Sequence, residues 1–126
     1  MEKLLMKSIL LVASFCFALP AASLASQSTA SGTLADGEQV CLSGFGFLAD
    51  AEATLEFDGT PVNGKLTIWD NTAGVRLVKV TGTSPLETGT VESVSGENAD
   101  LESCLTNKSG VNANYSLTFN FFSGFP

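Results

Sequence analysis

Three cysteines are the side chains with the most distinctive chemistry in this sequence. Cys16 lies in an apolar N-terminal run, whereas Cys41 and Cys104 lie far apart in the rest of the chain. The apolar run with Cys16 is part of a predicted signal peptide, described below, so an exported chain would keep only Cys41 and Cys104. An even pair of cysteines in an exported chain favours a disulfide, because oxidising compartments maintain such bonds. A Cys41–Cys104 bond would close a loop of about 60 residues and stabilise the fold by ~3–4 kcal/mol in the chain-entropy model. We predict this structural disulfide; two separate buried thiols are the alternative.

Catalytic residues are harder to find, because the sequence contains no histidine. Ser-His-Asp and Cys-His units are therefore excluded, and the commonest metal ligand is missing. Glu52 and Glu56 share one face of an expected strand, but they lie ~13 Å apart at ~3.3 Å per residue, too far for the carboxylate pair of a glycosidase. We predict no catalytic residue, no cofactor and no enzymatic activity.

Three acidic turns offer oxygen ligands to a hard cation such as Ca²⁺. They are Asp36-Gly37-Glu38, Asp58-Gly59 and Asp70-Asn71-Thr72. The same residues form ordinary turns, because Asp, Asn and Gly tolerate left-handed backbone conformations. The sequence also has no twelve-residue calcium loop. We predict no metal site, with calcium at one of these turns as the alternative.

Trp69, the only tryptophan, is the first candidate for ligand binding, together with Asp70 and Asn71 beside it. The alternation of its strand allows this tryptophan to face outward at the end of a hairpin. It could then stack on a sugar ring while the polar neighbours bind the sugar hydroxyls. The alternative is a tryptophan that covers the second face of a sheet or the end of a barrel.

The last strand supplies the second candidate surface, because residues 111–121 alternate strictly between apolar and polar. The polar parity holds Asn112, Asn114, Ser116, Thr118 and Asn120, which would form a row of donors and acceptors at ~6.6–6.8 Å spacing. Asn112, Asn114 and Ser116 are the candidate ligand-binding residues of this row; the solvent face of an outer sheet is the alternative. If the strand lies on a sheet edge, strand addition by a partner is a further binding mode.

Apolar and polar residues also alternate, with a period of two, in the segments that contain the candidate residues, and this alternation predicts strands. Strands are expected over residues 38–49, 51–57, 65–69, 75–81, 101–106 and 111–121, with a weaker one over 88–95. Overlapping apolar positions in residues 75–81 indicate a bulge or burial on both faces. About six to eight short strands separated by turns are typical of an all-β, single-domain antiparallel β-sandwich or small barrel.

Residues 1–25 have the three parts of a secretory signal peptide. Lys3 and Lys7 carry positive charge, residues 8–19 are apolar, and residues 21–25 are a small-residue cleavage region. The apolar run is shorter than the roughly 20 residues of a membrane span; an uncleaved anchor is the alternative. We expect a secreted or periplasmic protein with a flexible leader over residues 26–36 and a β domain over residues 37–126.

Charge narrows the class of partner. The chain has 6 basic and 13 acidic residues, and an acidic surface repels the phosphates of nucleic acid. Hydrophobic residues make up 44%, which excludes a charge-rich disordered tail. We expect a glycan or an extracellular protein as partner, with no nucleic acid and no stable membrane span.

Three segments together resemble a known group of domains. They are Gly44-Phe45-Gly46-Phe47, Gly64-Lys65-Leu66-Thr67-Ile68-Trp69-Asp70 and Gly74-Val75-Arg76-Leu77-Val78-Lys79-Val80. This combination is similar to small secreted bacterial β domains of undefined function, with a Phe-Gly-Phe strand followed by a Gly-x-Leu-x-x-x-Asp hairpin. The likeness covers about residues 37–122, and the paired cysteines are not part of its pattern. It implies a β domain that occurs alone or appended to extracellular proteins, and no catalytic residue is carried over.

These observations predict a secreted, non-enzymatic β-sandwich module that acts in extracellular or cell-surface interactions. A carbohydrate-binding module is one alternative. A small exported inhibitor or effector that docks on a target protein is the other.

Overall fold

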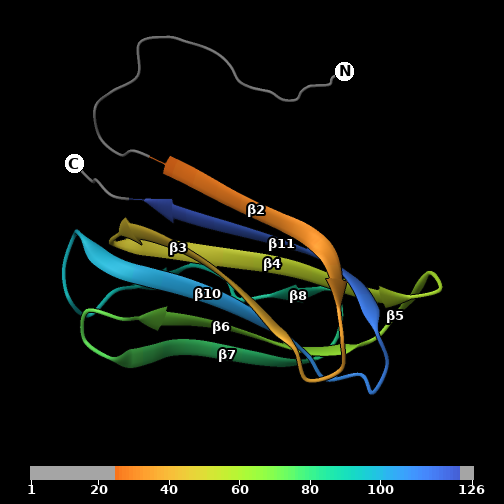
Figure 1. The fold of residues 1–126 in the computed structure, drawn as a ribbon. Coiled ribbons are helices and arrows are strands. Elements are labelled where there is room, and N and C mark those ends of the chain that lie inside the picture. Colours follow the sequence, from red (N-terminus) through yellow and green to blue (C-terminus); the bar gives the residue numbers. More distant parts are fainter. Residues whose placement is uncertain (1–24, 123–126) are drawn as a thin grey trace, which may run out of the picture.

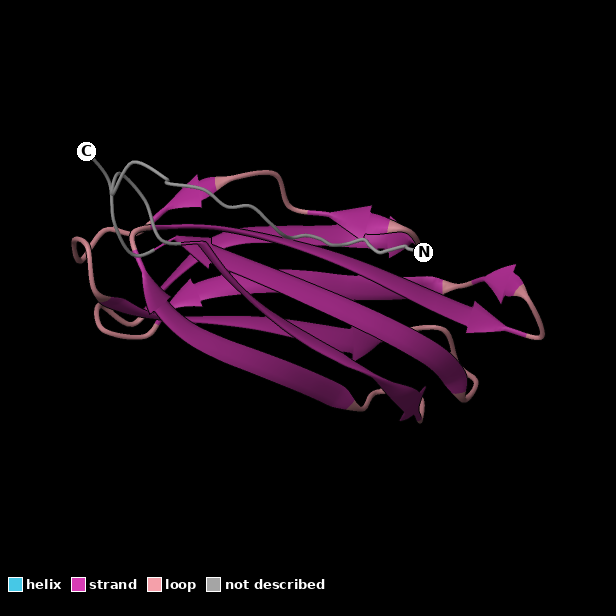
Figure 2. Ribbon diagram, turned by 90° about the horizontal axis from the view of Figure 1, so that it is seen from above, coloured by secondary structure: helices cyan, strands magenta, loops and turns pink. Residues whose placement is uncertain are grey.

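Alternating apolar and polar side chains give the long strands one buried and one outward side, and these strands stack into two sheets (Figure 1). The structure, a computed structural model, describes residues 25–122, and these contain strands and loops without a helix (Figure 2). The predicted signal peptide lies outside the described residues apart from Ala25. Within the described range, no helix is long and apolar enough to cross a membrane.

The first sheet has the order β2-β11-β4-β5, and two short strands, β8 and β9, also pair with β4. Its strands are β2 (Ala25–Leu34), β4 (Leu48–Phe57), β5 (Thr60–Pro61), β8 (Leu86–Glu87), β9 (Val91–Glu92) and β11 (Ala113–Phe122). The second sheet has the order β3-β10-β6-β7. Its strands are β3 (Gln39–Gly46), β6 (Asn63–Asp70), β7 (Val75–Thr83) and β10 (Ala99–Asn107). All strand pairs are antiparallel. The strands form two separate sheets, which confirms the predicted all-β sandwich over the alternative of a closed barrel.

The core lies between the two sheets and is formed by their inward-facing apolar side chains. Its largest fully buried members are Leu55, Leu66, Ile68, Leu101, Leu105, Leu117 and Phe119. Each such side chain contributes roughly 1.5–3 kcal/mol when it is removed from water. The buried positions of the predicted strands are therefore the alternate positions that apolar residues occupy in the sequence.

Gly44 allows the edge of the second sheet to approach the first. A Cβ atom at this position would lie 2.3 Å from the ring of Phe121 on β11. The glycine of this strand therefore serves the packing of an aromatic ring.

The expected flexible leader over residues 26–36 is corrected by the structure. Most of this segment belongs to β2, which pairs with β11 in continuous register from Ala25–Phe122 to Leu34–Ala113. The sequence did not reveal this strand, because only Leu34 is buried and the pairing depends on backbone hydrogen bonds that polar residues make equally well. Because β2 and β4 flank β11, the last strand is not a sheet edge, and within residues 25–122 β2 occupies that edge instead.

Two other predictions concern local irregularities. The bulge expected in residues 75–81 is confirmed: the register passes from Ile68–Val78 to Trp69–Arg76, so Leu77 is the extra residue on β7. The weak strand expected over residues 88–95 shrinks to the two residues of β9. Its valines are three residues apart, so they cannot share one strand face, and Val94 is 63% exposed.

Candidate functional site

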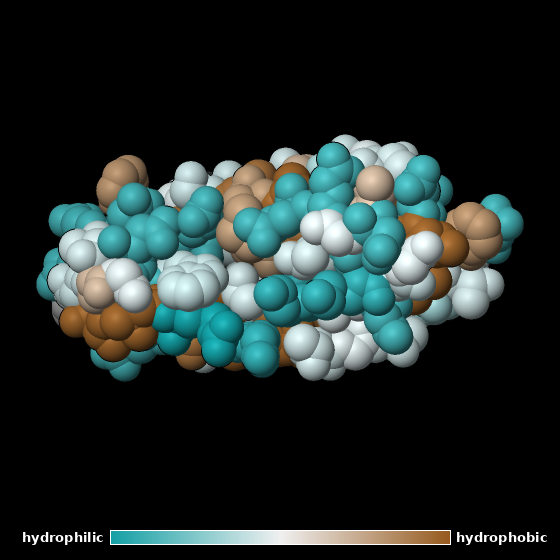
Figure 3. All heavy atoms as spheres, turned by 60° about the horizontal axis from the view of Figure 1, so that its bottom comes forward, coloured by the Kyte–Doolittle hydropathy of each residue, from teal (hydrophilic) through white to brown (hydrophobic). Residues whose placement is uncertain are grey.

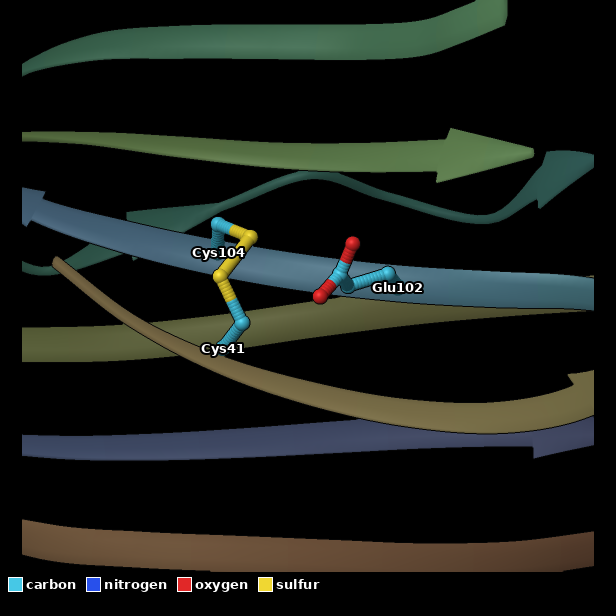
Figure 4. A group of neighbouring side chains, drawn as sticks. All are labelled: Cys41, Glu102 and Cys104. Atoms are coloured by element: carbon cyan, nitrogen blue, oxygen red, sulfur yellow. A yellow bond between two sulfur atoms is a disulfide. The ribbon is translucent and has the colours of Figure 1, made fainter. Parts of the chain in front are cut away.

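The predicted Cys41–Cys104 disulfide is present, and it joins neighbouring strands of the second sheet. Cys41 on β3 lies directly opposite Cys104 on β10, with their Cα atoms 4.1 Å apart. Both side chains project from the outer face of the sheet, away from the core (Figure 4). The bond therefore staples the edge strand β3 to an interior strand.

Trp69 lies on the same outer face. On β6 it is opposite Glu102 of β10 and Arg76 of β7. A shallow depression of about 310 Å³ surrounds it, which we call the Trp69 depression. Its lining residues are Gln39, Lys65, Thr67, Trp69, Asn71, Arg76, Glu102 and Cys104. Figure 3, seen from the side on which β6 and β7 lie, shows a mostly hydrophilic and neutral surface with hydrophobic residues near both ends and in the middle of its upper part.

Side chains in the Trp69 depression interact with one another. The Arg76 guanidinium carbon lies 5.9 Å from the centre of a Trp69 ring, within the range of a cation–π interaction. Asn71 donates a hydrogen bond of 2.9 Å from its side-chain amide to the Glu102 carboxylate. Gln39 places its side-chain amide nitrogen 3.1 Å from the sulfur of Cys41. The depression therefore combines an aromatic surface, amide groups and charges of both signs.

Asp70, predicted to act beside Trp69, faces the opposite way and is fully buried. Its carboxylate accepts hydrogen bonds from the backbone N–H groups of Ala73, at 3.2 Å, and Val94, at 3.0 Å. Burial alone would raise the pKa of this carboxyl, but the hydrogen bonds from the Ser95 side chain and from three backbone groups outweigh burial and lower the pKa below its usual range. Asp70 therefore fixes the β6–β7 turn and the loop after β9, and it is not accessible to a ligand.

The polar row of the last strand faces outward, as its alternation predicted. Asn114 and Ser116 are exposed, and Thr118 and Asn120 are half-buried. Asn120 accepts a hydrogen bond from Gln27 of β2 and donates one to Asp50 of β4, both of 2.8 Å. These residues belong to a polar surface that continues over β2 and β4.

Asn112 precedes β11 and is exposed, so it does not belong to the polar row of the strand. The row itself lies on the outer face of the first sheet, and Trp69 lies on the outer face of the second. Asn71 joins Trp69 in its depression. The predicted ligand-binding residues therefore fall on two opposite faces and cannot form one site.

The acidic turn at residues 36–38 supports the connection from β2 to β3. Asp36 accepts a hydrogen bond of 2.8 Å from the backbone N–H of Gly110, and Glu38 accepts one of 2.8 Å from Ala35. These contacts are typical of turn formation. The prediction that no metal is bound there stays a prediction.

Five lining residues of the Trp69 depression were not predicted as site residues from the sequence: Gln39, Lys65, Thr67, Arg76 and Glu102. The signal that could have found Lys65 and Glu102 is strand parity, because Lys65 shares the parity of Trp69 and Glu102 shares that of Cys104. Their meeting on one face depends on the pairing of β10 with β6, which parity does not specify.

Fold and disulfide together define the chain as a disulfide-stapled antiparallel β-sandwich. No family model and no curated protein matches the sequence. Among solved structures, the chain is similar to one described by the words "Bacillus endospore appendages form a novel family of disulfide-linked pili". The TM-score is 0.43 and the identity is 10%, over 88% of this chain and 97% of the other. That likeness is too distant to assign a family or a function, and the resemblance to small secreted bacterial β domains stays a prediction.

Proposed function

We propose that this chain is an exported, non-enzymatic β-sandwich that binds an extracellular partner through the outer face of its second sheet. The observation that carries this proposal is the Trp69 depression, in which a half-buried aromatic ring lies among amide and charged side chains. Binding surfaces combine these features, because an aromatic ring offers a rigid apolar contact and the polar groups fix the orientation of the partner.

The frame beneath the depression supports binding without rearrangement. Strand β10, which carries Glu102, lies between β3 and β6 and is joined to β3 by the disulfide. A side chain on such a strand loses little freedom when a partner binds, so less of the interaction energy is lost to ordering.

A role in binding fits the chemistry of the depression better than catalysis does. Its acid, Glu102, already accepts a hydrogen bond from Asn71, and Arg76 lies against Trp69. The chain has no histidine to serve as a general base. We therefore assign the depression to recognition.

Carbohydrate is the ligand class that the Trp69 depression favours. The apolar face of a sugar ring stacks on an indole, while amides such as those of Asn71 and Gln39 bind hydroxyl groups. Arg76, 5.9 Å from the Trp69 ring, must share the aromatic surface with the sugar. An acidic sugar would use this arrangement, because its carboxylate can pair with the guanidinium while the ring stacks.

Docking on a target protein is the alternative function, and strand β2 favours it. This edge strand of the first sheet contains no charged residue and no proline over Ala25–Leu34. Charges and prolines are the features that protect sheet edges from pairing with other chains. A small exported inhibitor or effector could use such an edge for strand addition to its target.

A glycan array that includes neutral and acidic oligosaccharides tests the carbohydrate function, followed by titration of the Trp69 fluorescence. Trp69→Phe and Trp69→Ala variants are compared with Phe57→Ala, because Phe57 is 45% exposed on the first sheet and serves as a matched aromatic control. We expect Trp69→Ala to weaken binding by about tenfold or more, Trp69→Phe to weaken it less, and Phe57→Ala to leave it unchanged. Equal binding by the wild type and Trp69→Ala would reject the second sheet as the binding face.

The variants Ser28→Pro and Thr29→Pro in β2 test the alternative function, strand addition to a target protein. Neighbouring residues of a strand direct their N–H groups to opposite sides, so one of Ser28 and Thr29 faces the open edge and the other faces β11. We expect the edge-facing variant to keep the melting temperature and the other to lower it. If strand addition operates, the edge-facing variant loses binding to a purified target; retained binding would contradict it.

A further inference from the structure

We propose that reduction of the Cys41–Cys104 disulfide creates a binding site for a thiophilic divalent cation such as Zn²⁺, with Cys41, Cys104 and Glu102 as ligands. The inference does not rest on the proposed binding function, since it concerns the reduced form of the chain. It starts from the grouping of these three side chains on the outer face of the second sheet.

Geometry brings the three ligand atoms together. The two sulfurs and a carboxylate oxygen of Glu102 all lie within 4.8 Å of one another. Glu102 precedes Cys104 by two residues on β10, so both side chains leave the same face of the strand (Figure 4). Cys41 extends toward them from the neighbouring strand β3. Two thiolates and a carboxylate are a ligand set that Zn²⁺ accepts in tetrahedral geometry.

The sheet keeps the cysteines adjacent without the covalent bond. β10 pairs with β3 in continuous register from Ala99–Gly46 to Thr106–Gln39, and it pairs with β6 on its other side. These ladders hold the two Cα atoms close to their separation of 4.1 Å. Two thiolates on one tetrahedral Zn²⁺ need their sulfurs about 3.8 Å apart, given Zn–S bonds of about 2.3 Å. Rotation of the cysteine side chains supplies that change.

The chemical step balances with a small thiol as the reductant. Two thiol molecules are oxidised to one disulfide, and the Cys41–Cys104 bond takes up their two electrons and two protons. The cation then replaces the two sulfur-bound protons, which pass to solvent, and its oxidation state does not change. Lys65 and Arg76 line the same depression and offset the negative charge of the ligand set.

Two amides lie where they can orient the ligands. Asn71 donates a hydrogen bond of 2.9 Å to one carboxylate oxygen of Glu102, which leaves the other oxygen for the cation. The Gln39 side-chain nitrogen lies 3.1 Å from the sulfur of Cys41 and can donate to the thiolate. Hydrogen bonds of this kind to ligand atoms typically change metal affinity by about 10–100-fold.

Metal titration of the reduced chain tests the inference. The protein is reduced with a phosphine, the phosphine is removed without oxygen, and Co²⁺ or Zn²⁺ is added alone. We expect one ion per chain, with thiolate-to-cobalt charge-transfer absorption and a change in the fluorescence of Trp69, which lies opposite Glu102. The oxidised chain should show neither signal. Equal binding by the oxidised and reduced chains would overturn the proposal.

Variants identify the ligands. We expect Glu102→Gln to weaken binding by about tenfold or more, and we expect the Cys41→Ser, Cys104→Ser double variant to abolish the charge-transfer band. Glu87→Gln is the matched control, because Glu87 is an exposed acid on β8 of the other sheet. Wild-type affinity in Glu102→Gln contradicts the carboxylate ligand. Circular dichroism of the reduced, metal-free chain must retain the strand signal; its loss would contradict the preformed frame.

Discussion

The two outer faces of the sandwich differ in how their polar side chains are used. On the first sheet, hydroxyls and amides of β2 and β11 lie beside the acids of β4 in regular rows. On the second sheet, the rows are interrupted by Trp69 and by the disulfide, and charges of both signs lie around them. Both faces follow from the same alternation, yet only the second combines an aromatic ring with charged side chains.

The first face uses its polar side chains for hydrogen bonds between strands, as in the group Gln27, Asn120 and Asp50. They form one hydrogen-bonded row across three strands, so their polar groups are largely used within the protein. Such rows fix strand register. The second face has a covalent bond between β3 and β10, and its half-buried Trp69 lies among charged side chains. The comparison predicts that covalent and buried polar changes on the second sheet cost more stability than outward changes on the first.

Removal of the disulfide should have the largest effect. The Cys41→Ser, Cys104→Ser variant is expected to lower the free energy of unfolding by ~3–4 kcal/mol, because the unfolded chain regains the freedom of a long loop. Urea unfolding measures the change. The matched control is Ser31→Ala, Ser116→Ala, a directly opposed pair on the first face, for which we expect less than about 1 kcal/mol. Equal losses would break the comparison.

Asp70→Ala should follow in size. It leaves the part-buried N–H groups of Ala73 and Val94 without their acceptor, at an expected cost of about 2–3 kcal/mol in the free energy of unfolding. Asp70→Asn keeps one acceptor oxygen and should lose less. Trp69 is the outward-facing neighbour of Asp70, and its variant Trp69→Ala is the comparison that tests binding. A stable Asp70→Ala protein would contradict the structural role of this carboxylate.

Acid should weaken the fold partly through Asp70. Its pKa is lower in the folded state than in the unfolded chain, so its contribution is complete above the unfolded pKa of about 4 and is lost as pH falls through the lower, folded pKa. Unfolding measured from neutral pH down to about pH 2 should therefore show a smaller acid loss for Asp70→Asn than for wild type. Identical pH profiles would show that this carboxyl does not contribute.

Asn120→Ala should have the smallest effect, although it removes the centre of the hydrogen-bonded row. We expect a loss of about 1 kcal/mol or less, since these groups are partly exposed and water replaces the lost partners. Thermal unfolding measures it. A loss as large as that of the disulfide would show that the first face also contributes strongly to stability.

Much of the fold was predictable because alternation is a local property. Residues 113–121 showed which side chains of β11 would be buried, and the extra apolar positions before Thr81 indicated the bulge on β7. Polar strands lack this signal, so β2 was interpreted as a leader. Asp70 was assigned to a ligand site because its neighbour is a tryptophan, although adjacent residues of a strand face opposite ways.

The sequence alone determined the strongly alternating strands and the buried parity of each, because alternation depends only on residue type. It also indicated the pairing of Cys41 with Cys104, the two cysteines outside the apolar N-terminal run. Tertiary structure decided which strands are neighbours. It placed Glu102 beside Trp69 and the two cysteines, and it gave β2 the edge of the first sheet. The physical reason is that one strand pattern is compatible with many strand orders, and the order is selected by packing between distant segments.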